Sequence, residues 1–135
     1  MATWEDVRRL VMELPEVVED EARGNLAWRV RKKLVAWERP LRTSDLTALG
    51  IEPPEDPILA VRTPSVGDKE ALVAAEPEIY FTTPHFNGFP AVLVWLDRID
   101  GDELAELLIE AWVTQAPKRL SKEFLAGLDG DISQG

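Results

Sequence analysis

Apolar side chains recur at steps of three and four through the first fifteen residues, which is the spacing of one helix face. Thr3 and Asp6 stand at the positions of a capping box, and Pro15 marks the end of the segment. The pattern predicts a helix over residues 4–14, whose buried stripe consists of Trp4, Val7, Leu10, Val11 and Leu14.

After Gly24 the apolar period changes to two, as in a half-buried strand over residues 26–30. A second short, aromatic strand follows at Lys33–Glu38, and only Arg31 and Lys32 separate the two, so they form a hairpin. Residues 16–21 are mostly acidic, and their like charges predict an exposed connection in front of the hairpin.

The rest of the chain alternates short apolar runs with helical patterns. The strand predicted over residues 91–97 is apolar at successive positions from Ala91 to Leu96, which predicts a central strand covered on both faces. The other predicted elements are a helix from Thr43 or Ser44 to Gly50, a strand over 58–62, a helix capped by Asp68 and ended by Pro77, a strand over 78–83, a helix capped by Asp100, and a short helix from Pro117 to Gly127.

This order predicts an α+β fold: a single domain with a largely antiparallel sheet and helices packed on one face. A chain of 135 residues fits one domain, which we place at residues 1–127, followed by a disordered tail at 128–135. No apolar run reaches the roughly 18 residues that span a bilayer. The N-terminus also lacks the layout of a signal peptide, so we expect a cytoplasmic protein that does not enter a membrane.

Charge is unevenly distributed along the chain, although its formal total is −10. Residues 23–42 hold seven basic side chains and one acidic one, inside an otherwise acidic sequence. This basic island coincides with the hairpin, whose Lys and Arg side chains could contact DNA phosphates. The predicted nucleic-acid-binding residues are Arg29, Arg31, Lys32, Lys33 and Arg39. The alternative is that these cations form exposed ion pairs with residues 16–21.

The sequence offers no catalytic or metal-binding constellation, so we expect neither an enzyme nor a cofactor. It contains no Cys, and His85 is its only histidine, with no carboxylate between Glu78 and Asp97 to orient it. Asn87 and Gly88 form a strong turn signal, which makes a structural role for the His85 loop the simpler reading. The Trp residues suit core packing, although one exposed indole could stack on a base or a ligand.

Three runs of the sequence, YFTTPHFNGFPAVLVWLDRID, DELAELLIEAW and APKRL, resemble the MmcQ/YjbR family of small bacterial proteins. The resemblance implies a CyaY-like, double-wing α+β fold and a DNA-binding role. Lys32 stands where this family's hairpin is expected to have Gly. The most specific part is a loop pattern that comprises Thr83, Pro84, His85, Asn87 and Gly88.

The leading functional prediction is a cofactor-free binding module with weak, salt-sensitive DNA binding through the basic hairpin. The alternative is a protein-interaction or regulatory module that uses its acidic surface and binds no nucleic acid. A third, less favoured possibility is a domain that handles a small molecule or a metal around His85.

Overall fold

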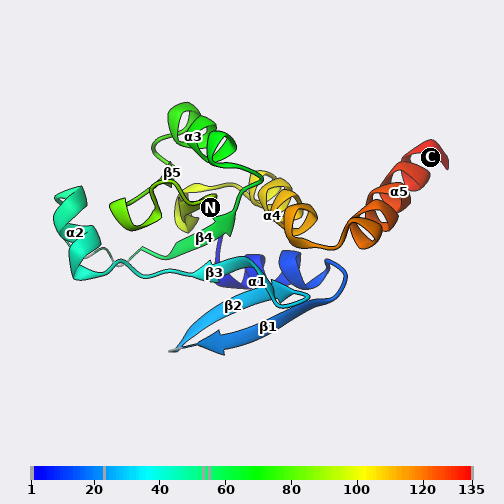
Figure 1. Ribbon diagram of the computed structural model, residues 1–135, viewed down its shortest axis with the longest axis horizontal. Coiled ribbons are helices and arrows are strands. Elements are labelled where there is room, and N and C mark those ends of the chain that lie inside the picture. The colour runs from blue at the N-terminus through cyan, green and yellow to red at the C-terminus, as the bar shows by residue number, and fades with distance from the viewer. Residues whose placement is uncertain (1, 23, 53, 55, 135) are drawn as a thin grey trace.

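The computed structural model describes residues 2–22, 24–52, 54 and 56–134, with residues 22 and 128–134 described by their backbone alone (Figure 1). Helices and strands alternate along the chain much as the sequence predicts. The elements are α1 (Trp4–Met12), β1 (Val17–Ala22), β2 (Asn25–Val30), β3 (Lys33–Glu38), α2 (Thr43–Leu49), β4 (Ile58–Arg62), α3 (Val66–Ala75), β5 (Tyr80–Phe81), the 3₁₀ helix η1 (Pro84–Phe86), β6 (Ala91–Trp95), the 3₁₀ helix η2 (Leu96–Arg98), α4 (Gly101–Gln115) and α5 (Lys118–Gln134).

The described strands form one six-stranded sheet in the order β1-β2-β3-β4-β6-β5, and every neighbouring pair is antiparallel. In Figure 1, β1 and β2 lie at the bottom, α2 lies at one end of the molecule, and α5 extends away at the other end. The predicted α+β class with an antiparallel sheet is therefore confirmed.

Helices α1, α3 and α4 cover one face of the sheet. The buried stripe of α4, which includes Leu104, Leu108 and Trp112, packs into the same core as Trp28 of β2 and Val92 of β6. Caps fix where these helices begin: Thr3 and Asp6 form the capping box of α1, and the Asp100 side chain accepts from the Glu103 N–H. The predicted caps at both helices are confirmed.

The opposite face of the sheet carries a smaller core of its own. It consists of Ile58, Ala60, Phe86, Ala91 and Leu93, and no helix of the sheet-covering group lies over it. Strand β6 contributes alternate residues to both cores, so the prediction that both of its faces are covered is confirmed. The cover on this second face is partial, because it comes mainly from the connection over residues 84–90.

The prediction of a connection at residues 16–21 is wrong, because Val17–Ala22 forms the edge strand β1, although Val18, Asp20 and Glu21 are exposed as expected. Val17 pairs with Val30 and Asp20 with Ala27 in an antiparallel register. The like charges do not prevent pairing because cations neutralise them: Arg8 of α1 donates two hydrogen bonds of 2.7 Å to the Glu19 carboxylate.

Several predicted boundaries also shift. A turn over residues 77–79 shortens the predicted strand 78–83 to β5, and η2 ends β6 at Trp95. Helix α3 is capped by Ser65, with Asp68 three residues inside it, and α2 is capped by Arg42 rather than by Thr43 or Ser44. The backbone of α5 stays helical to Gln134 instead of ending at Gly127. The side chains of 128–134 and all of residue 135 lie outside the described part, and the domain boundary at 127 stays a prediction.

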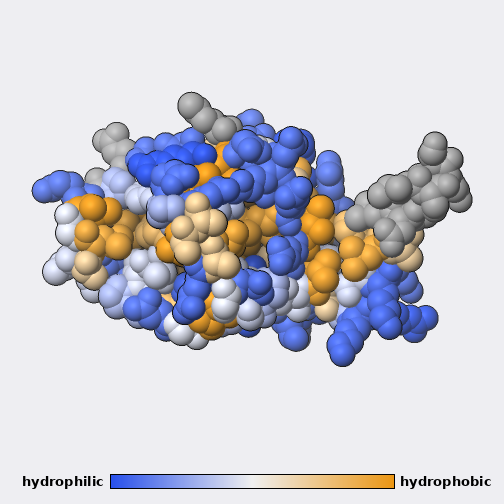
Figure 2. Space-filling view, turned by 90° about the horizontal axis from the view of Figure 1, so that it is seen from above, coloured by the Kyte–Doolittle hydropathy of each residue, from blue (hydrophilic) through white to orange (hydrophobic). Residues whose placement is uncertain are grey.

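The surface seen in Figure 2 is mainly hydrophilic, with apolar atoms gathered near α2 and where α4 meets α5. Large exposed apolar side chains are scattered over the described residues; they include Met12, Val18, Ile51, Phe89 and Leu125. No helix of the described part is long and apolar enough to cross a membrane.

The β2–β3 turn places Arg31 and Lys32 in the left-handed region, with φ of 48° and 72°. A two-residue hairpin with positive φ at both central residues is a type I′ turn, in which Gly is strongly favoured at the second position. Lys32 therefore holds a conformation that costs a residue with a Cβ about 1 kcal/mol or more.

Replacing Lys32 with Gly should raise the free energy of unfolding by up to about 1 kcal/mol, because relief of the left-handed strain exceeds the entropy cost of Gly. Urea denaturation measures the difference. Lys33→Gly is the matched control and should lower stability, since Lys33 lies in β3 with no positive φ. A Lys32→Gly variant less stable than the parent would contradict the turn assignment.

Candidate functional site

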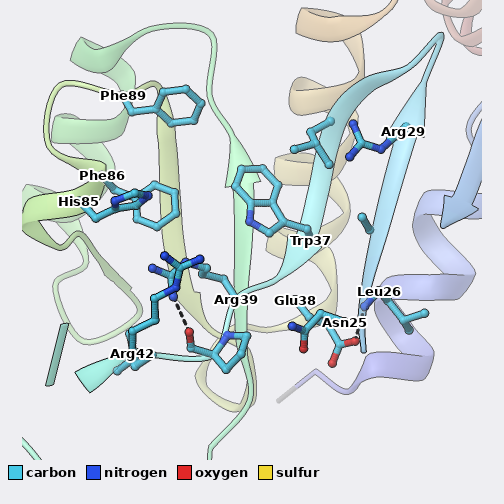
Figure 3. Close-up of a pocket in the computed structure, with 14 residues that line it drawn as sticks. Asn25, Leu26, Arg29, Trp37, Glu38, Arg39, Arg42, His85, Phe86 and Phe89 are labelled. Atoms are coloured by element: carbon cyan, nitrogen blue, oxygen red, sulfur yellow. Dashed lines mark hydrogen bonds between the residues drawn. The ribbon is translucent and has the colours of Figure 1, made fainter. Parts of the chain in front are cut away.

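A groove of about 700 Å³ lies on the sheet face that α1, α3 and α4 leave open (Figure 3). One wall comes from β2, β3 and the segment after β3, and the other comes from the connection over residues 84–90. The lining residues are Asn25, Leu26, Ala27, Arg29, Leu34, Trp37, Glu38, Arg39, Pro40, Leu41, Arg42, His85, Phe86 and Phe89.

The sheet register places Trp37 in this groove. Trp37 pairs with Ala27 on β2 and with Ala60 on β4, whereas the adjacent pair of Trp28 with Ala36 faces the helices. The small side chain of Ala27 beside the indole keeps the floor of the groove low. The register shifts between Trp28 and Arg29, so Leu34 pairs with Arg29 at the upper end of the same wall in Figure 3.

Three rings of the 84–90 connection form the opposite wall. Phe86 is buried, with its ring centroid 6.4 Å from that of Trp37, and His85 meets Phe86 edge-on at 5.2 Å. Phe89 lies 6.2 Å from Phe86 and is 42% exposed. Gly88, with φ of 78°, provides the turn between the two Phe residues, and this explains why Asn87 and Gly88 belong in the loop.

A buried lysine holds this connection in place. Lys69 of α3 is buried and donates from Nζ to the carbonyl oxygens of Phe86 and Phe89, the latter at 3.0 Å. Burial lowers the pKa of Lys69 from its usual value. These bonds tie the aromatic wall to α3, so the position of both Phe rings depends on the Lys69 side chain.

A buried ion pair holds the other end of the groove. Arg39 donates from Nη2 to Asp45 Oδ2 at 3.0 Å, and its guanidinium lies 5.2 Å from the centroid of Phe86. Burial tends to raise the pKa of Asp45, but the Arg42 backbone N–H and the Arg39 guanidinium outweigh it and hold the pKa below its usual range. Arg39 is only 6% exposed, so its place in the fold accounts for it without a DNA contact.

Two exposed residues, the cationic Arg42 and the polar His85, line the groove near the Arg39–Asp45 pair. Figure 3 shows Arg42 extending upward toward the space beneath His85. Among the described residues, no carboxylate lies within ion-pair distance of the Arg42 guanidinium. Arg42 can therefore offer its charge to a ligand in the groove.

Two of the cations predicted to bind DNA form ion pairs with carboxylates of β1 and of the turn before it. Arg31 donates two hydrogen bonds to the Glu16 carboxylate, one of them at 3.0 Å, which raises the pKa of Arg31 and lowers that of Glu16. The Nε of Arg29 lies 3.8 Å from Asp20 Oδ2, and Arg29 also donates to the Lys32 carbonyl. These contacts are the ion pairs that the alternative reading of the hairpin expects.

Lys32 and Lys33 are the other two predicted DNA contacts in the hairpin. Both are exposed, and neither has a carboxylate within ion-pair distance in the described part of the chain. The positive charge available to a phosphate at the hairpin tip therefore resides mainly on these two residues.

The predicted family loop separates into structural and exposed residues. Thr83 is buried and caps η1, and Pro84 opens that helix. His85 faces the groove, whereas Asn87 and Gly88 are exposed at the turn. The sequence thus located one wall of the groove, but it did not reveal that Trp37, Phe89 and Arg42 also line the groove. The one available signal was two Phe residues flanking a turn, where polar residues are usual.

Carboxylates elsewhere do not form a metal centre in the described part of the chain, where no group of three or more His, Cys, Asp or Glu side chains is suitably placed. Glu103, at the start of α4, lies beside Glu76 at the end of α3 instead. The proximity of Glu103 raises the pKa of Glu76, and the Tyr80 hydroxyl donates to Glu103. This cluster is separate from the groove and contributes no group to it.

The fold and the groove define a small single-domain α+β protein with one open sheet face. The YjbR family model matches residues 12–114, and the chain belongs to this family. It is 54% identical over 129 residues to the uncharacterized proteins Rv2570 of Mycobacterium tuberculosis and Mb2600 of Mycobacterium bovis, covering 93% of this chain and 98% of each relative. The crystal structure of Deinococcus radiodurans protein DR2400, a DUF419 domain, matches with a TM-score of 0.62 at 24% identity over 84% of this chain and 78% of that one.

Asp45→Asn should destabilise the protein by about 3 kcal/mol near neutral pH, because it leaves the buried Arg39 guanidinium without its counter-charge. The pKa of Asp45 is lowered in the folded chain, so the carboxylate contributes its full stabilisation above the usual Asp pKa and loses it as the pH falls through the lowered value. The difference between variant and parent should therefore shrink in acid.

Urea denaturation at pH 7 and at pH 3 measures both effects. Asp56→Asn is the control, since Asp56 is exposed and should change stability by less than about 0.5 kcal/mol. A gap between Asp45→Asn and the parent that stays constant over this range would contradict the role of the ionised carboxylate.

Proposed function

We propose that this protein is a binding module and that the aromatic groove, rather than the hairpin tip, is its main ligand-binding surface. One observation carries the proposal: on the open sheet face, the rings of Trp37, His85 and Phe89 line a hollow of about 700 Å³. Ligand pockets typically measure roughly 300–1,000 Å³ and are mostly apolar with a few polar groups. Covering such rings releases roughly 25 cal/mol per Å² of apolar surface.

The construction of the groove favours binding further. One wall stands on paired strands. The other is held by hydrogen bonds from Lys69, and the Arg39 guanidinium, which is paired with Asp45, lies over its Phe86 ring. A surface fixed in this way loses little conformational entropy when a ligand arrives. The groove is therefore suited to a ligand that fits its present shape.

The neutral fluorescent dye N-phenyl-1-naphthylamine tests the groove as an apolar binding surface. The dye should bind the parent protein saturably. Trp37→Ser and Phe89→Ser should each raise its dissociation constant about tenfold, because each removes ring surface from the site. Phe89→Ser is the safer variant, since the ring is already 42% exposed and its loss should leave the fold intact.

Leu125→Ser is the matched control, because Leu125 is similarly exposed, at 41%, but lies on α5 outside the groove. Thermal denaturation of each variant establishes that it is folded. Equal loss of dye binding in the control and in Phe89→Ser, or no binding by the parent, would count against the groove.

DNA binding through the hairpin is a second candidate function, supported by the exposed and unpaired state of Lys32 and Lys33 in the described part of the chain. Changing both to Glu should abolish binding of labelled duplex DNA at low salt. Glu16→Gln should strengthen binding several-fold, because it releases Arg31.

The double change of Lys118 and Lys122 to Glu in α5 is the control for this candidate, since it alters net charge equally on another exposed surface. If the hairpin variant loses no more affinity than the α5 variant, the hairpin has no specific part in DNA binding.

A further inference from the structure

We propose, on the basis of the proposed function, that the groove takes a small molecule consisting of a planar ring and one anionic group. The ring would lie on Trp37, and the carboxylate or phosphate would lie between Arg42 and His85. Three features of the described residues support this assignment: the distribution of charge along the groove, the faces of its rings and the charge of the whole chain.

The charge of the groove is unbalanced at one end. Asp45 neutralises Arg39, and Asp20 lies 3.8 Å from Arg29 at the opposite end. The Glu38 carboxylate accepts a hydrogen bond of 2.6 Å from the Leu26 N–H, which directs it toward β2. Arg42 is left as the groove cation without a carboxylate partner in the described part, so an anion should bind beside it.

The rings of the groove differ in what already contacts them. The guanidinium of Arg39 lies over Phe86, and that of Arg62 lies over Phe89, each 5.2 Å from the ring centroid. Trp37 is half-buried, and its ring neighbour among the described aromatic residues is Phe86, tilted by 35°. The indole thus provides the largest aromatic surface in the groove that no cation covers, and planar rings stack well on indole.

The acidity of the protein favours a small anion over a polymer. A nucleic acid needs several cations along its path, and each phosphate is repelled by a chain of net charge −10. A ligand with a single anionic group has only one charge that the acidic protein repels, and Arg42 alone can pair with that charge. The volume of about 700 Å³ also matches a single small molecule.

Displacement of N-phenyl-1-naphthylamine tests this ligand class with four probes: adenosine 5′-monophosphate, indole-3-acetate, adenosine and inorganic phosphate. At least one ring anion should displace the dye at least tenfold more effectively than adenosine, and inorganic phosphate alone should not displace it. The two ring anions distinguish a phosphate from a carboxylate as the preferred group.

Arg42→Gln should weaken binding of the effective ring anion at least tenfold more than it weakens binding of the neutral dye, because the variant loses the cation but retains the apolar walls. Arg119→Gln is the control, since Arg119 is 92% exposed on α5, and it should change neither. Equal binding of adenosine and both ring anions, failure of both ring anions, or an unaffected Arg42→Gln variant would overturn the ligand class. The groove would stand in each case if the dye still binds, whereas loss of dye binding itself would overturn the proposed function.

Discussion

The open sheet face of this protein depends most on the hydrogen bonds that the Lys69 ammonium group donates. This group is buried beneath the 84–90 connection and bonds two carbonyl oxygens, of Phe86 and Phe89, at the two ends of the turn. Each oxygen also accepts one backbone N–H, that of Phe89 at Phe86 and that of Ala91 at Phe89. The ammonium group adds a second, charge-assisted hydrogen bond to each. From the other side, Arg39 lies over Phe86 and pairs with Asp45. Two buried cations thus fix one aromatic wall over an otherwise open sheet.

Charge pairing explains why the hairpin is a less attractive binding surface than its composition suggests. The basic strand β2 lies directly beside the acidic strand β1, so Arg29 and Arg31 have carboxylates within reach. Exposed pairs of this kind add little stability, but they reduce the field that a phosphate would experience. The groove differs because Arg42 keeps its charge available beside apolar rings. The same basic segment therefore contains both a neutralised part and an available part.

The sequence predicted the elements whose signals are local. Caps and 3.6-residue periodicity located α1 and α4. The period of two located β2, and a short aromatic run located β3. Strand β1 was missed because its charges oppose pairing in isolation, and the cations that lie beside its carboxylates, Arg8 and Arg29, are brought near by the fold. The His85 loop was recognised, but the groove was not. Trp37 and Phe89 are about fifty residues apart, and the register of β3 with β4 and of β4 with β6 brings them to one face.

Indole N–H resonances offer the most direct test of the groove as the binding surface. Trp28 donates its Nε1–H to Glu19, and Trp112 donates to the Pro15 carbonyl, so these two indoles serve as internal references. During titration with N-phenyl-1-naphthylamine, a ¹H–¹⁵N correlation spectrum should show the Trp37 indole resonance shifting to saturation while those of Trp28 and Trp112 stay in place. An unchanged Trp37 resonance, with shifts confined to the amides of Lys32 and Lys33, would contradict the account.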